Sequence, residues 1–317
     1  MNPTTLRGKL AIRDRALARI RAFLADRGVL EVETPALSRA ATTDPALASL
    51  KLDVQSLAGV HYLHTSPEYA MKRLLADGSG DIYQLARVFR DGELGRWHQP
   101  EFQLLEWYRL GFDEFDLMHE VYELLRVVLE PELPRLARLD LSYAQAFIAA
   151  LEVDPLHFDA AASVRLTAAL AERGIDVPTG LAHAELFDLA LATAIVPAWP
   201  QGTAVFLYDY PADQAALAAI KPGEPPVAAR FEVFLNGLEL GNGFRELTDA
   251  TEQRQRFATD LSRRRASGLP EPPIDEAFLA ALAKGLPDCA GVALGVDRLI
   301  ALLTGARALA DVVNLPH

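Results

Sequence analysis

Hydrophobic positions recur along this chain with two periods, and the period of each stretch predicts its secondary structure. Spacings of three and four residues are typical of amphipathic helices, here over residues 7–26, 68–76, 114–129, 249–267 and 275–284. Short apolar or alternating runs predict strands at 28–35, 82–89, 203–208, 229–236 and 238–244. The stretch 142–194 is mainly helical in pattern. Strands joined by hairpins, with helices grouped apart, predict an α+β fold with an antiparallel sheet flanked by helices.

The hairpin over residues 82–110 is the most informative of these stretches. Its first strand ends at Arg90, a charged loop covers 91–99, and a proline then restarts the extended chain because it fixes its own φ angle. A guanidinium at the open end of a hairpin can hold a phosphate through two parallel donors, and Phe102 offers a flat face to a base. The alternatives are an edge-strand salt bridge for Arg90 and core packing for Phe102. The pattern predicts a nucleotide site at this hairpin.

Two further motifs lie far apart in the chain and carry glycines next to a helix. Gly28-Val-Leu-Glu-Val-Glu-Thr-Pro35 follows the first amphipathic helix, and Gly291-Val-Ala-Leu-Gly-Val-Asp-Arg298 is a glycine-rich strand that leads into a helix with an arginine in its first turn. Glycine lets a backbone come close to a ligand. Thr65-Ser-Pro-Glu68 and Gly241-Asn-Gly-Phe-Arg-Glu-Leu247 lie between these motifs. Three ordered motifs, the hairpin included, with these two segments between them are a far more specific signal than one glycine pattern alone.

In this order the motifs resemble motifs 1, 2 and 3 of class II aminoacyl-tRNA synthetases, and the wording of the hairpin resembles the lysyl branch. The resemblance covers nearly the whole chain. Lysyl-tRNA synthetases carry an anticodon-binding β-barrel ahead of motif 1, whereas about two dozen residues precede Gly28 here. The chain is similar to the elongation factor P lysine ligases, a stand-alone paralogue family of these synthetases. We therefore expect one catalytic domain over 1–317, with a helical insert at about 142–194 and no anticodon-binding domain.

This resemblance implies a ligase that uses ATP and Mg²⁺ to activate (R)-β-lysine as an aminoacyl-adenylate. The acyl group would then pass to the ε-amine of a lysine on translation elongation factor P. Two other interpretations keep the fold: a truncated lysyl-tRNA synthetase that activates α-lysine, and a regulatory module that only binds nucleotide. The first would need a separately encoded anticodon domain. The second is disfavoured because Arg90, Glu239, Glu246 and Arg298 are all present.

At the nucleotide end, the resemblance implies that Arg90 holds the α-phosphate and the reacting carboxylate. Arg298 and His98 would hold the far phosphates, and Arg298 would cover the adenine opposite Phe102. A solvated loop histidine is the alternative for His98. Glu232 and Glu239 lie on two strands joined by a turn at Asn236-Gly237, so these two carboxylates are the expected Mg²⁺ ligands. The other nucleotide contacts that the resemblance implies are Asp91, Gly92, Gln99, Leu240 and Gly295, together with Glu239.

Acidic residues inside apolar or motif segments mark the amino-acid end. A diamino acid brings two ammonium groups that need carboxylate partners, and Glu68, Glu106 and Glu246 are the candidates. Each glutamate taken singly has an alternative partner in a nearby arginine. These arginines are Arg73, Arg87 and Arg109. The resemblance adds substrate contacts from Ser66, Pro67, Tyr108, Asn242 and Phe244.

Ala293 predicts the choice of substrate. Lysyl-tRNA synthetases usually read Gly-Leu-Gly-Ile-Gly in motif 3, whereas this chain reads Gly291-Val-Ala-Leu-Gly295, as the ligases do. The added methyl would occupy space that the amine of α-lysine uses, while the amine of β-lysine lies one carbon further along. We therefore expect a preference for (R)-β-lysine. Ordinary packing of Ala293 is the alternative, and Gly241 matches the synthetases rather than some of the ligases.

Composition and charge narrow the partners and the compartment. The net charge of −12 argues against the broad basic face that binds a long nucleic acid, so we expect no tRNA partner. Cys289 is the single cysteine, which excludes an intrachain disulfide and predicts a small core residue. The first residues contain no apolar signal segment, and prolines interrupt the uncharged stretch 189–208. We expect a cytoplasmic protein without a membrane span.

The first helix also predicts the oligomeric state. Leu10, Leu17, Ile20 and Leu24 recur at helical spacing, and a strand follows. In class II synthetases this motif forms the dimer. We therefore expect a homodimer, and packing of the helix on its own sheet is the alternative.

Overall fold

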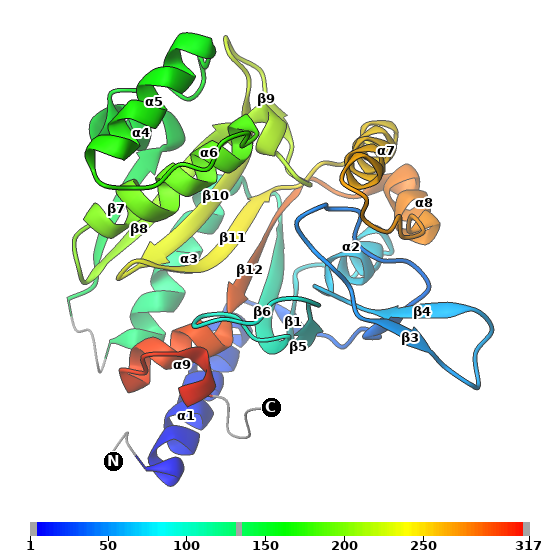
Figure 1. Cartoon of the computed structure of the whole chain (residues 1–317). Helices are drawn as coiled ribbons and strands as arrows, with labels where there is room; N and C mark the ends of the chain where they lie inside the picture. Colours follow the sequence, from blue (N-terminus) through cyan, green and yellow to red (C-terminus); the bar gives the residue numbers. More distant parts are fainter. Residues whose placement is uncertain (1–4, 131–134, 313–317) are drawn as a thin grey trace.

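The computed structural model describes residues 5–130 and 135–312, and a nine-stranded sheet runs through this part of the chain (Figure 1). The strands follow the order β1-β5-β6-β12-β11-β10-β8-β7, and β9 pairs with β10 beside this path. Their bounds are β1 Leu30–Glu31, β5 Ile82–Phe89, β6 Glu101–Leu110, β7 Ala137–Ser142, β8 Thr203–Pro211, β9 Ile220–Lys221, β10 Val227–Leu235, β11 Leu238–Arg245 and β12 Cys289–Gly295.

The inner strands pair antiparallel, as predicted, whereas the pairs at both edges of the sheet are parallel. β1 runs parallel to β5, and β7 runs parallel to β8. A parallel pair needs a long crossover, which the helical segment 143–198 provides between β7 and β8. β7 is absent from the predicted strands; its residues are exposed or only partly buried, so no continuous apolar run marks it. The strand predicted at 28–35 is shorter than expected, since only Leu30–Glu31 pairs with β5.

The five helices predicted at 7–26, 68–76, 114–129, 249–267 and 275–284 begin and end within one residue of those bounds. The described residues contain nine α-helices. They are α1 Leu6–Ala25, α2 Glu68–Ala76, α3 Glu114–Leu129, α4 Tyr143–Leu151, α5 Ala160–Glu172, α6 His183–Ala190, α7 Ala250–Ala266, α8 Glu276–Gly285 and α9 Val296–Thr304. Asp113 starts α3 by accepting hydrogen bonds from the backbone N–H groups of Phe115 and Asp116. None of the helices in the described ranges has the length and apolarity needed to cross a membrane.

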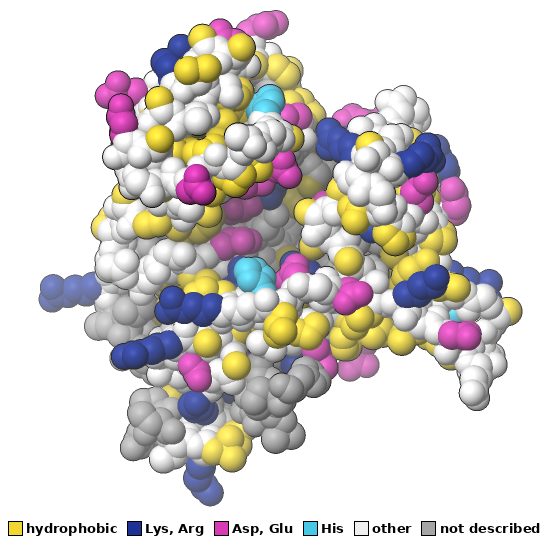
Figure 2. Space-filling model, viewed as in Figure 1, with side chains coloured by type: hydrophobic (Ala, Val, Ile, Leu, Met, Phe, Trp, Pro, Cys, Tyr) yellow, Lys and Arg dark blue, Asp and Glu magenta, His cyan; other side chains and the backbone are white. Residues whose placement is uncertain are grey.

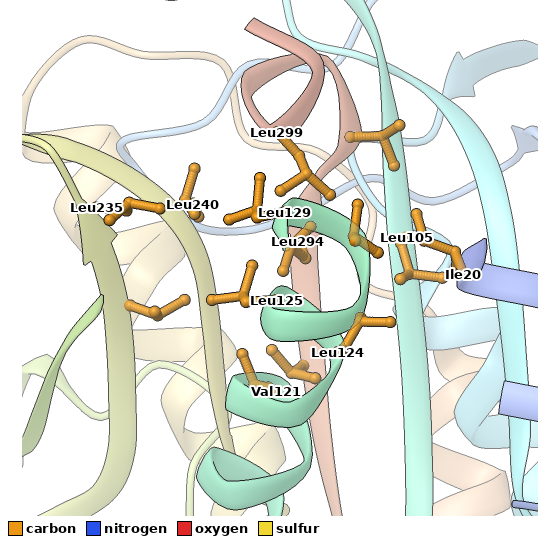
Figure 3. Close-up of a cluster of buried hydrophobic side chains, with 14 of the residues drawn as sticks. Ile20, Leu105, Val121, Leu124, Leu125, Leu129, Leu235, Leu240, Leu294 and Leu299 are labelled. Carbon is orange, nitrogen blue, oxygen red and sulfur yellow. The ribbon is translucent and has the colours of Figure 1, made fainter. Parts of the chain in front are cut away.

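Helices α1, α3 and α9 cover one face of the sheet (Figure 3). Ile20 of α1, Leu125 of α3 and Leu299 of α9 share a buried cluster with strand side chains. Leu105 of β6 and Leu294 of β12 come from the strands. Burying one leucine contributes roughly 1.5–3 kcal/mol, so the cluster fixes the middle strands firmly. These same strands carry the predicted site residues on their other face.

The opposite face of the sheet carries helices only towards its ends. α4 and α6 pack over β7 and β8 around Tyr143 and Phe187. α2, α7 and α8 pack over the other end around Met71, Phe257 and Phe278, a cluster that also buries the single cysteine as predicted. Figure 2 shows a hollow between these two groups of helices, with acidic side chains inside it. The middle strands β6, β12 and β11 therefore present one face to the hollow.

A small second sheet, absent from the predicted elements, borders this hollow. Its strands are β2 Leu37–Ser38, β4 Val60–Leu63 and β3 Lys51–Asp53, in the order β2-β4-β3. The loop between β2 and β3 is tied to α7 by the buried Arg264, which donates to the carbonyl oxygens of Asp44 and Leu47 at 2.7 and 3.0 Å. This connection places the loop beside the cavity.

Candidate active site

A cavity of about 500 Å³ lies between the two groups of helices. Its walls come from β6, β11, β12, α2, α7 and the segments 35–49 and 90–99. The predicted residues that line it are Ser66, Pro67, Glu68, Arg90, His98, Gln99, Phe102, Glu106, Tyr108, Glu239, Leu240, Asn242, Phe244, Glu246, Ala293, Gly295 and Arg298. Asp91, Gly92 and Glu232 are not part of the lining. The motifs that are separate in the sequence thus meet at one place.

Asp91 and Gly92 form the turn that follows β5. The Asp91 carboxylate accepts a hydrogen bond from the Gly92 backbone N–H at 2.9 Å, and the Asp91 N–H donates to the Ala48 carbonyl at 2.8 Å. Gly92 has φ +76°, a conformation that favours glycine. Both residues are exposed. The structure gives them a turn-forming position outside the cavity, and their contacts with ATP stay a prediction.

Arg298, in the first turn of α9, joins motif 3 to the hairpin and to β11. Its Nη1 donates to the Glu239 carbonyl at 2.8 Å, and its Nε donates to the Trp97 carbonyl at 3.4 Å. Its Nη2 lies 3.0 Å from Nε2 of His98. Because a guanidinium only donates, His98 accepts at Nε2 in this arrangement. The contacts hold Arg298 at the predicted nucleotide end with its guanidinium at the cavity wall.

Arg90, at the end of β5, lies beside Phe102. Its Nε donates to the Thr65 carbonyl at 3.4 Å, and its guanidinium is 5.0 Å from the centre of the Phe102 ring. A salt bridge, which was the alternative interpretation of Arg90, is also present, because Nη1 lies 3.5 Å from Oε1 of Glu93. Both side chains of this pair are about one quarter exposed, at 26% and 25%, so the pair contributes only about 0–1 kcal/mol. The place of Arg298 on the opposite face of a bound adenine stays a prediction.

The two predicted metal ligands differ in their surroundings. Glu239 lines the cavity with 43% of its side chain exposed, and its Oε2 lies 3.5 Å from Nη1 of Arg298. Glu232 lies on the neighbouring strand and is paired with Arg230, whose Nη2 donates to its Oε1 at 2.6 Å. Burial raises the pKa of Glu232 to about 7, the Glu239 charge adds to this, and Arg230 opposes it. The hairpin therefore brings the two carboxylates within electrostatic reach of each other, but it turns Glu232 towards Arg230.

Asp297 is a site residue that the sequence prediction missed. It is 2% exposed, forms an ion pair with Arg13 of α1, and accepts a hydrogen bond from the backbone N–H of Gln103 in β6 at 2.8 Å. Arg13 also donates to the Gln103 side chain at 3.1 Å. A buried carboxylate is costly unless it is paired, so this contact ties the three motifs into one arrangement. An acidic residue beside Arg298 in an otherwise apolar motif was the available signal.

Glu106 lies deep at the other end of the cavity. It is 2% exposed, and its two oxygens accept hydrogen bonds from the hydroxyl groups of Ser66 and Tyr108, each at 2.7 Å. Burial raises the pKa of Glu106 to about 7 and the nearby Glu68 charge adds to this, while the two hydroxyls oppose it. A carboxylate held in this way keeps further acceptor capacity for a cation.

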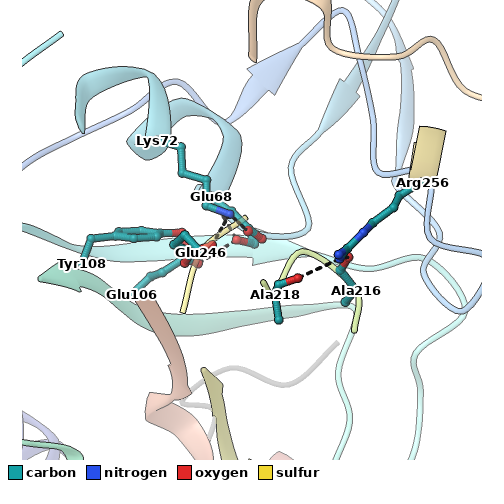
Figure 4. A network of polar contacts seen from close by, with 9 residues as sticks. Glu68, Lys72, Glu106, Tyr108, Ala216, Ala218, Glu246 and Arg256 are labelled. Carbon is teal, nitrogen blue, oxygen red and sulfur yellow. Dashed lines mark hydrogen bonds and ion pairs between the residues drawn. The ribbon is translucent and has the colours of Figure 1, made fainter. Parts of the chain in front are cut away.

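Glu68 and Glu246 share one lysine beside Glu106 (Figure 4). Nζ of Lys72 lies 2.5 Å from Oε1 of Glu68 and 2.5 Å from Oε2 of Glu246. Burial raises the pKa of Glu246 to about 8, Lys72 opposes this, and the charges of Glu68 and Glu106 add to it. We call Glu68, Glu106 and Glu246 the acidic pocket. All three line the cavity.

Two of the three arginines proposed as alternative partners of these glutamates pair with other residues. Arg87 is 3.9 Å from Glu101, and Arg109 is 3.0 Å from Asp81. That alternative is therefore wrong for these two arginines. The missing partner, Lys72, follows Glu68 by four residues, a spacing that places two side chains side by side on a helix. This spacing was the signal in the sequence.

Strand β12 alternates between the core and the cavity. The side chains of Val292 and Leu294 pack in the core, whereas Gly291 and the residues two and four positions later line the cavity. A Cβ atom on Gly291 would lie 2.4 Å from Oε1 of Glu246 and 2.4 Å from Cε1 of Tyr108. Only glycine fits at this position, because the acidic pocket passes directly over the backbone.

Ala293 stands between two residues of the amino-acid end. It pairs with Asn242 of β11 on one side and with Glu106 of β6 on the other. Paired residues of neighbouring strands point to the same face, so the Ala293 methyl lies beside these side chains. The buried Oδ1 atom of Asn242 has no hydrogen-bond partner in the described part of the chain. It is an acceptor that a ligand can use.

The chain matches the family model described as class II tRNA synthetases (D, K and N) over residues 2–317. It is 48% identical to the elongation factor P–(R)-β-lysine ligase of Proteus mirabilis over 318 residues, which cover 99% of this chain and 96% of that protein. It is 48% identical to the protein of the same name from Salmonella typhi and 49% identical to that from Edwardsiella ictaluri. Each of these two matches covers 94% of this chain and 91% of the relative.

Proposed function

The chain belongs to the family of class II tRNA synthetases (D, K and N), and from this premise we propose that it is an ATP-dependent elongation factor P–(R)-β-lysine ligase. It joins (R)-β-lysine to ATP as an aminoacyl-adenylate. It then passes the β-lysyl group to the ε-amine of one lysine on translation elongation factor P. The names of its relatives and the geometry of the cavity support this proposal.

The observation that carries the proposal is the separation of charge along one cavity. Arg90 and Arg298 lie at one end, and the acidic pocket lies at the other. A diamino acid has one carboxylate and two ammonium groups, so it matches both ends when its carboxylate points towards the arginines. A substrate with an apolar side chain would leave a buried carboxylate without a cation, which is costly.

The first step needs no nucleophile from the protein. An oxygen of the substrate carboxylate attacks the α-phosphorus of ATP, and the bond to pyrophosphate breaks, so that pyrophosphate leaves with the electron pair. Arg90 holds the reacting carboxylate and the α-phosphate, and Arg298 and His98 hold the far phosphates. Phe102 stacks on the adenine. Positioning and charge stabilisation are thus the work of these side chains.

In the second step the ε-amine of the acceptor lysine attacks the carbonyl carbon of the adenylate, and AMP leaves. The amine must first lose a proton, since its reference pKa is about 10.4. The new amide bond joins the β-lysyl group to elongation factor P. The side chain of that lysine enters through the same cavity that holds the adenylate.

Mg²⁺ neutralises charge on the phosphates of ATP when it is bound. Glu239 fits as a ligand because its partly exposed carboxylate lines the cavity, and Glu232 is the second candidate although Arg230 holds one of its oxygens. In the described residues no group of three or more histidine, cysteine, aspartate or glutamate side chains could hold a metal ion by itself. ATP phosphates and water would therefore supply the remaining oxygens.

We also propose that the chain acts as a homodimer in the cytoplasm, where translation factors work, and without a tRNA substrate. Leu6 and Leu10 of α1 and Leu30 of β1 are exposed by 61%, 43% and 60%, and they form the candidate dimer face. Ile20 and Leu24, by contrast, are buried in the core of the chain itself. The net charge of −12 disfavours tRNA binding.

Exchange of pyrophosphate into ATP tests the proposed activation step. We expect exchange with (R)-β-lysine, weaker exchange with α-lysine, and none above background with leucine, which lacks the second ammonium group. A chain that binds ATP but supports no exchange with either lysine would instead be a nucleotide-binding module. Exchange with leucine at the rate of (R)-β-lysine would contradict the role given to the acidic pocket.

A further inference from the structure

Lys72 contacts the acidic pocket from behind. Its side chain is 1% exposed, and Lys72 is not among the residues that line the cavity, although Glu68 and Glu246 are. The two carboxylates therefore face a ligand on one side and the lysine ammonium on the other. Because Lys72 has no access to the cavity, a bound substrate and Lys72 do not compete for the same position.

The surroundings of Lys72 hold its ammonium in this position. Nζ lies 5.4 Å from the centre of the Phe244 ring and 5.8 Å from the centre of the Phe278 ring. Aromatic faces attract a cation. The two ion pairs at 2.5 Å fix the ammonium from the side of the carboxylates. A lysine enclosed in this way has no route to water, so it remains a fixed part of the wall.

The charges of this region match a doubly charged ligand. Three carboxylates and one ammonium leave two net negative charges, and the two ammonium groups of a diamino acid balance them. Oε1 of Glu246 is buried and has no hydrogen-bond partner in the described residues, whereas Oε2 lies 2.5 Å from Nζ of Lys72. The pocket thus keeps acceptor capacity directed at a cation in the cavity.

We propose that Lys72 is a positioning residue, a fixed internal counter-ion that favours the ionised form of the buried carboxyls of Glu106 and Glu246, so that the acidic pocket binds both ammonium groups of the substrate. This inference rests on the proposed function and adds to it the residue that sets the charge of the amino-acid end. Lys72 does not touch the substrate. It acts through Glu68 and Glu246.

The titratable groups around Lys72 indicate what its removal does. Glu68 and Glu246 face it directly, Glu106 is the third charge of the pocket, and Tyr108 and Cys289 are neutral neighbours. Burial raises the pKa of Glu106 and of Glu246, and Lys72 lowers both. Without the lysine these carboxylates hold protons up to a higher pH, and a protonated carboxyl does not attract an ammonium group.

The test measures kcat/KM for (R)-β-lysine in the exchange assay across about pH 6 to 9.5. The wild-type value falls on the acidic side as the pocket takes up protons. In Lys72→Met the pH below which kcat/KM falls, here called the acidic limb, is higher by at least about one pH unit. At neutral pH this lowers kcat/KM about tenfold. The lower kcat/KM reflects a higher KM for (R)-β-lysine, and this difference from the wild type becomes smaller towards pH 9. The KM for ATP is unchanged. Lys284→Met, an exposed lysine paired with Asp77, is the matched control and keeps the wild-type profile.

A second pair of variants keeps the test decisive if Lys72→Met does not fold. Glu68→Gln removes one negative charge, and the double variant Lys72→Met with Glu68→Gln restores the net charge of the wild type. The acidic limb of the double variant should lie at nearly the same pH as that of the wild type. It should lie at least about one pH unit above the acidic limb of Glu68→Gln. Calorimetry can also measure how many protons the protein releases when it binds (R)-β-lysine without ATP. The pH at which this release occurs should be lowest for Glu68→Gln and similar for the double variant and the wild type.

The outcomes separate this inference from the proposed function. Wild-type protein that supports no exchange with (R)-β-lysine contradicts the proposed function. Active wild-type protein whose limb is unchanged in Lys72→Met contradicts only the role of Lys72. Equal limbs in Glu68→Gln and in the double variant contradict it as well, because the charge of Lys72 would then have no effect on the pocket.

Discussion

The two ends of the cavity are built in opposite ways. At the nucleotide end, the side chains of Arg90 and Arg298 remain 26% and 19% exposed. At the amino-acid end, Lys72 and Glu246 are each only 1% exposed and pair with each other. Charges near water are screened and exchange partners easily, whereas buried charges interact strongly and must be matched.

This difference assigns the two ends different parts of the reaction. Under the proposed function, the open end suits ATP, a large ligand that enters and leaves in every cycle. The closed end suits a small substrate whose charge is tested on entry. Asp297 ties α1, β6 and α9 together beside Arg298, at the nucleotide end. Substitutions at the two ends should therefore change different kinetic constants.

The largest effect is expected at the nucleotide end. Arg298→Ala removes a guanidinium aimed at the phosphates, and losing one such donor costs about 100- to 1000-fold in rate. Exchange with (R)-β-lysine should fall by this factor. Arg265→Ala, which removes an exposed arginine paired with Glu271, is the control and should be unaffected. An undiminished rate in Arg298→Ala would show that the nucleotide end is misassigned.

A smaller loss of a different kind is expected at the acidic pocket. Glu246→Gln removes the charge of a buried carboxylate that has a cation on each side, which costs about 2–5 kcal/mol or more. We expect about a 100-fold loss in kcat/KM for (R)-β-lysine, with the KM for ATP unchanged. Glu276→Gln, an exposed partner of Arg254, is the control. Equal increases in the KM for (R)-β-lysine and in the KM for ATP would contradict the separate roles of the two ends.

Ala293 tests specificity within the amino-acid end. Ala293→Gly deletes a methyl beside Glu106 and Asn242 and makes room for the α-amine. One methyl group discriminates by about 10- to 200-fold, so we expect the preference for (R)-β-lysine over α-lysine to narrow by about tenfold. The gain should come from better use of α-lysine, measured as kcat/KM in the exchange assay. The same preference ratio in wild type and variant would show that the methyl merely packs.

The smallest effect on rate is expected at the candidate dimer face. Leu10→Asp places a charge on an exposed apolar position of α1, remote from the cavity lining. Light scattering should give twice 34.6 kDa for the wild type and a mass near 34.6 kDa for the variant. Exchange by the folded variant should stay within about threefold of the wild type. A wild-type mass of 34.6 kDa at micromolar concentration would overturn the dimer.

Local patterns predict most of the fold. Helix α2 at Glu68–Ala76 and α3 at Glu114–Leu129 have the predicted bounds, and the hairpin 82–110 is confirmed. Each of these elements carries a long apolar period or a clear cap. β7 and the small second sheet lack both features, because their strands are short and only partly buried. Their pairing depends on neighbours that no local pattern indicates.

The candidate site divides in the same way. Arg90 and Arg298 follow from motifs that are continuous in the sequence, and both line the cavity. The pairs that hold the site together, Lys72 with Glu246 and Arg13 with Asp297, join residues that are distant in the chain. A sequence shows which of these residues are charged, but it does not show which residue each of them pairs with when it is buried. Only the fold reveals which charges meet.

The central claim concerns the acceptor of the acyl group, and one competition experiment tests it directly. Purified chain is incubated with ATP, Mg²⁺, (R)-β-lysine, elongation factor P and tRNA in one vessel, and the intact masses of the factor and the tRNA are measured. The account predicts that elongation factor P gains the mass of one β-lysyl group and that the tRNA is unchanged. Unmodified elongation factor P together with aminoacylated tRNA would contradict it.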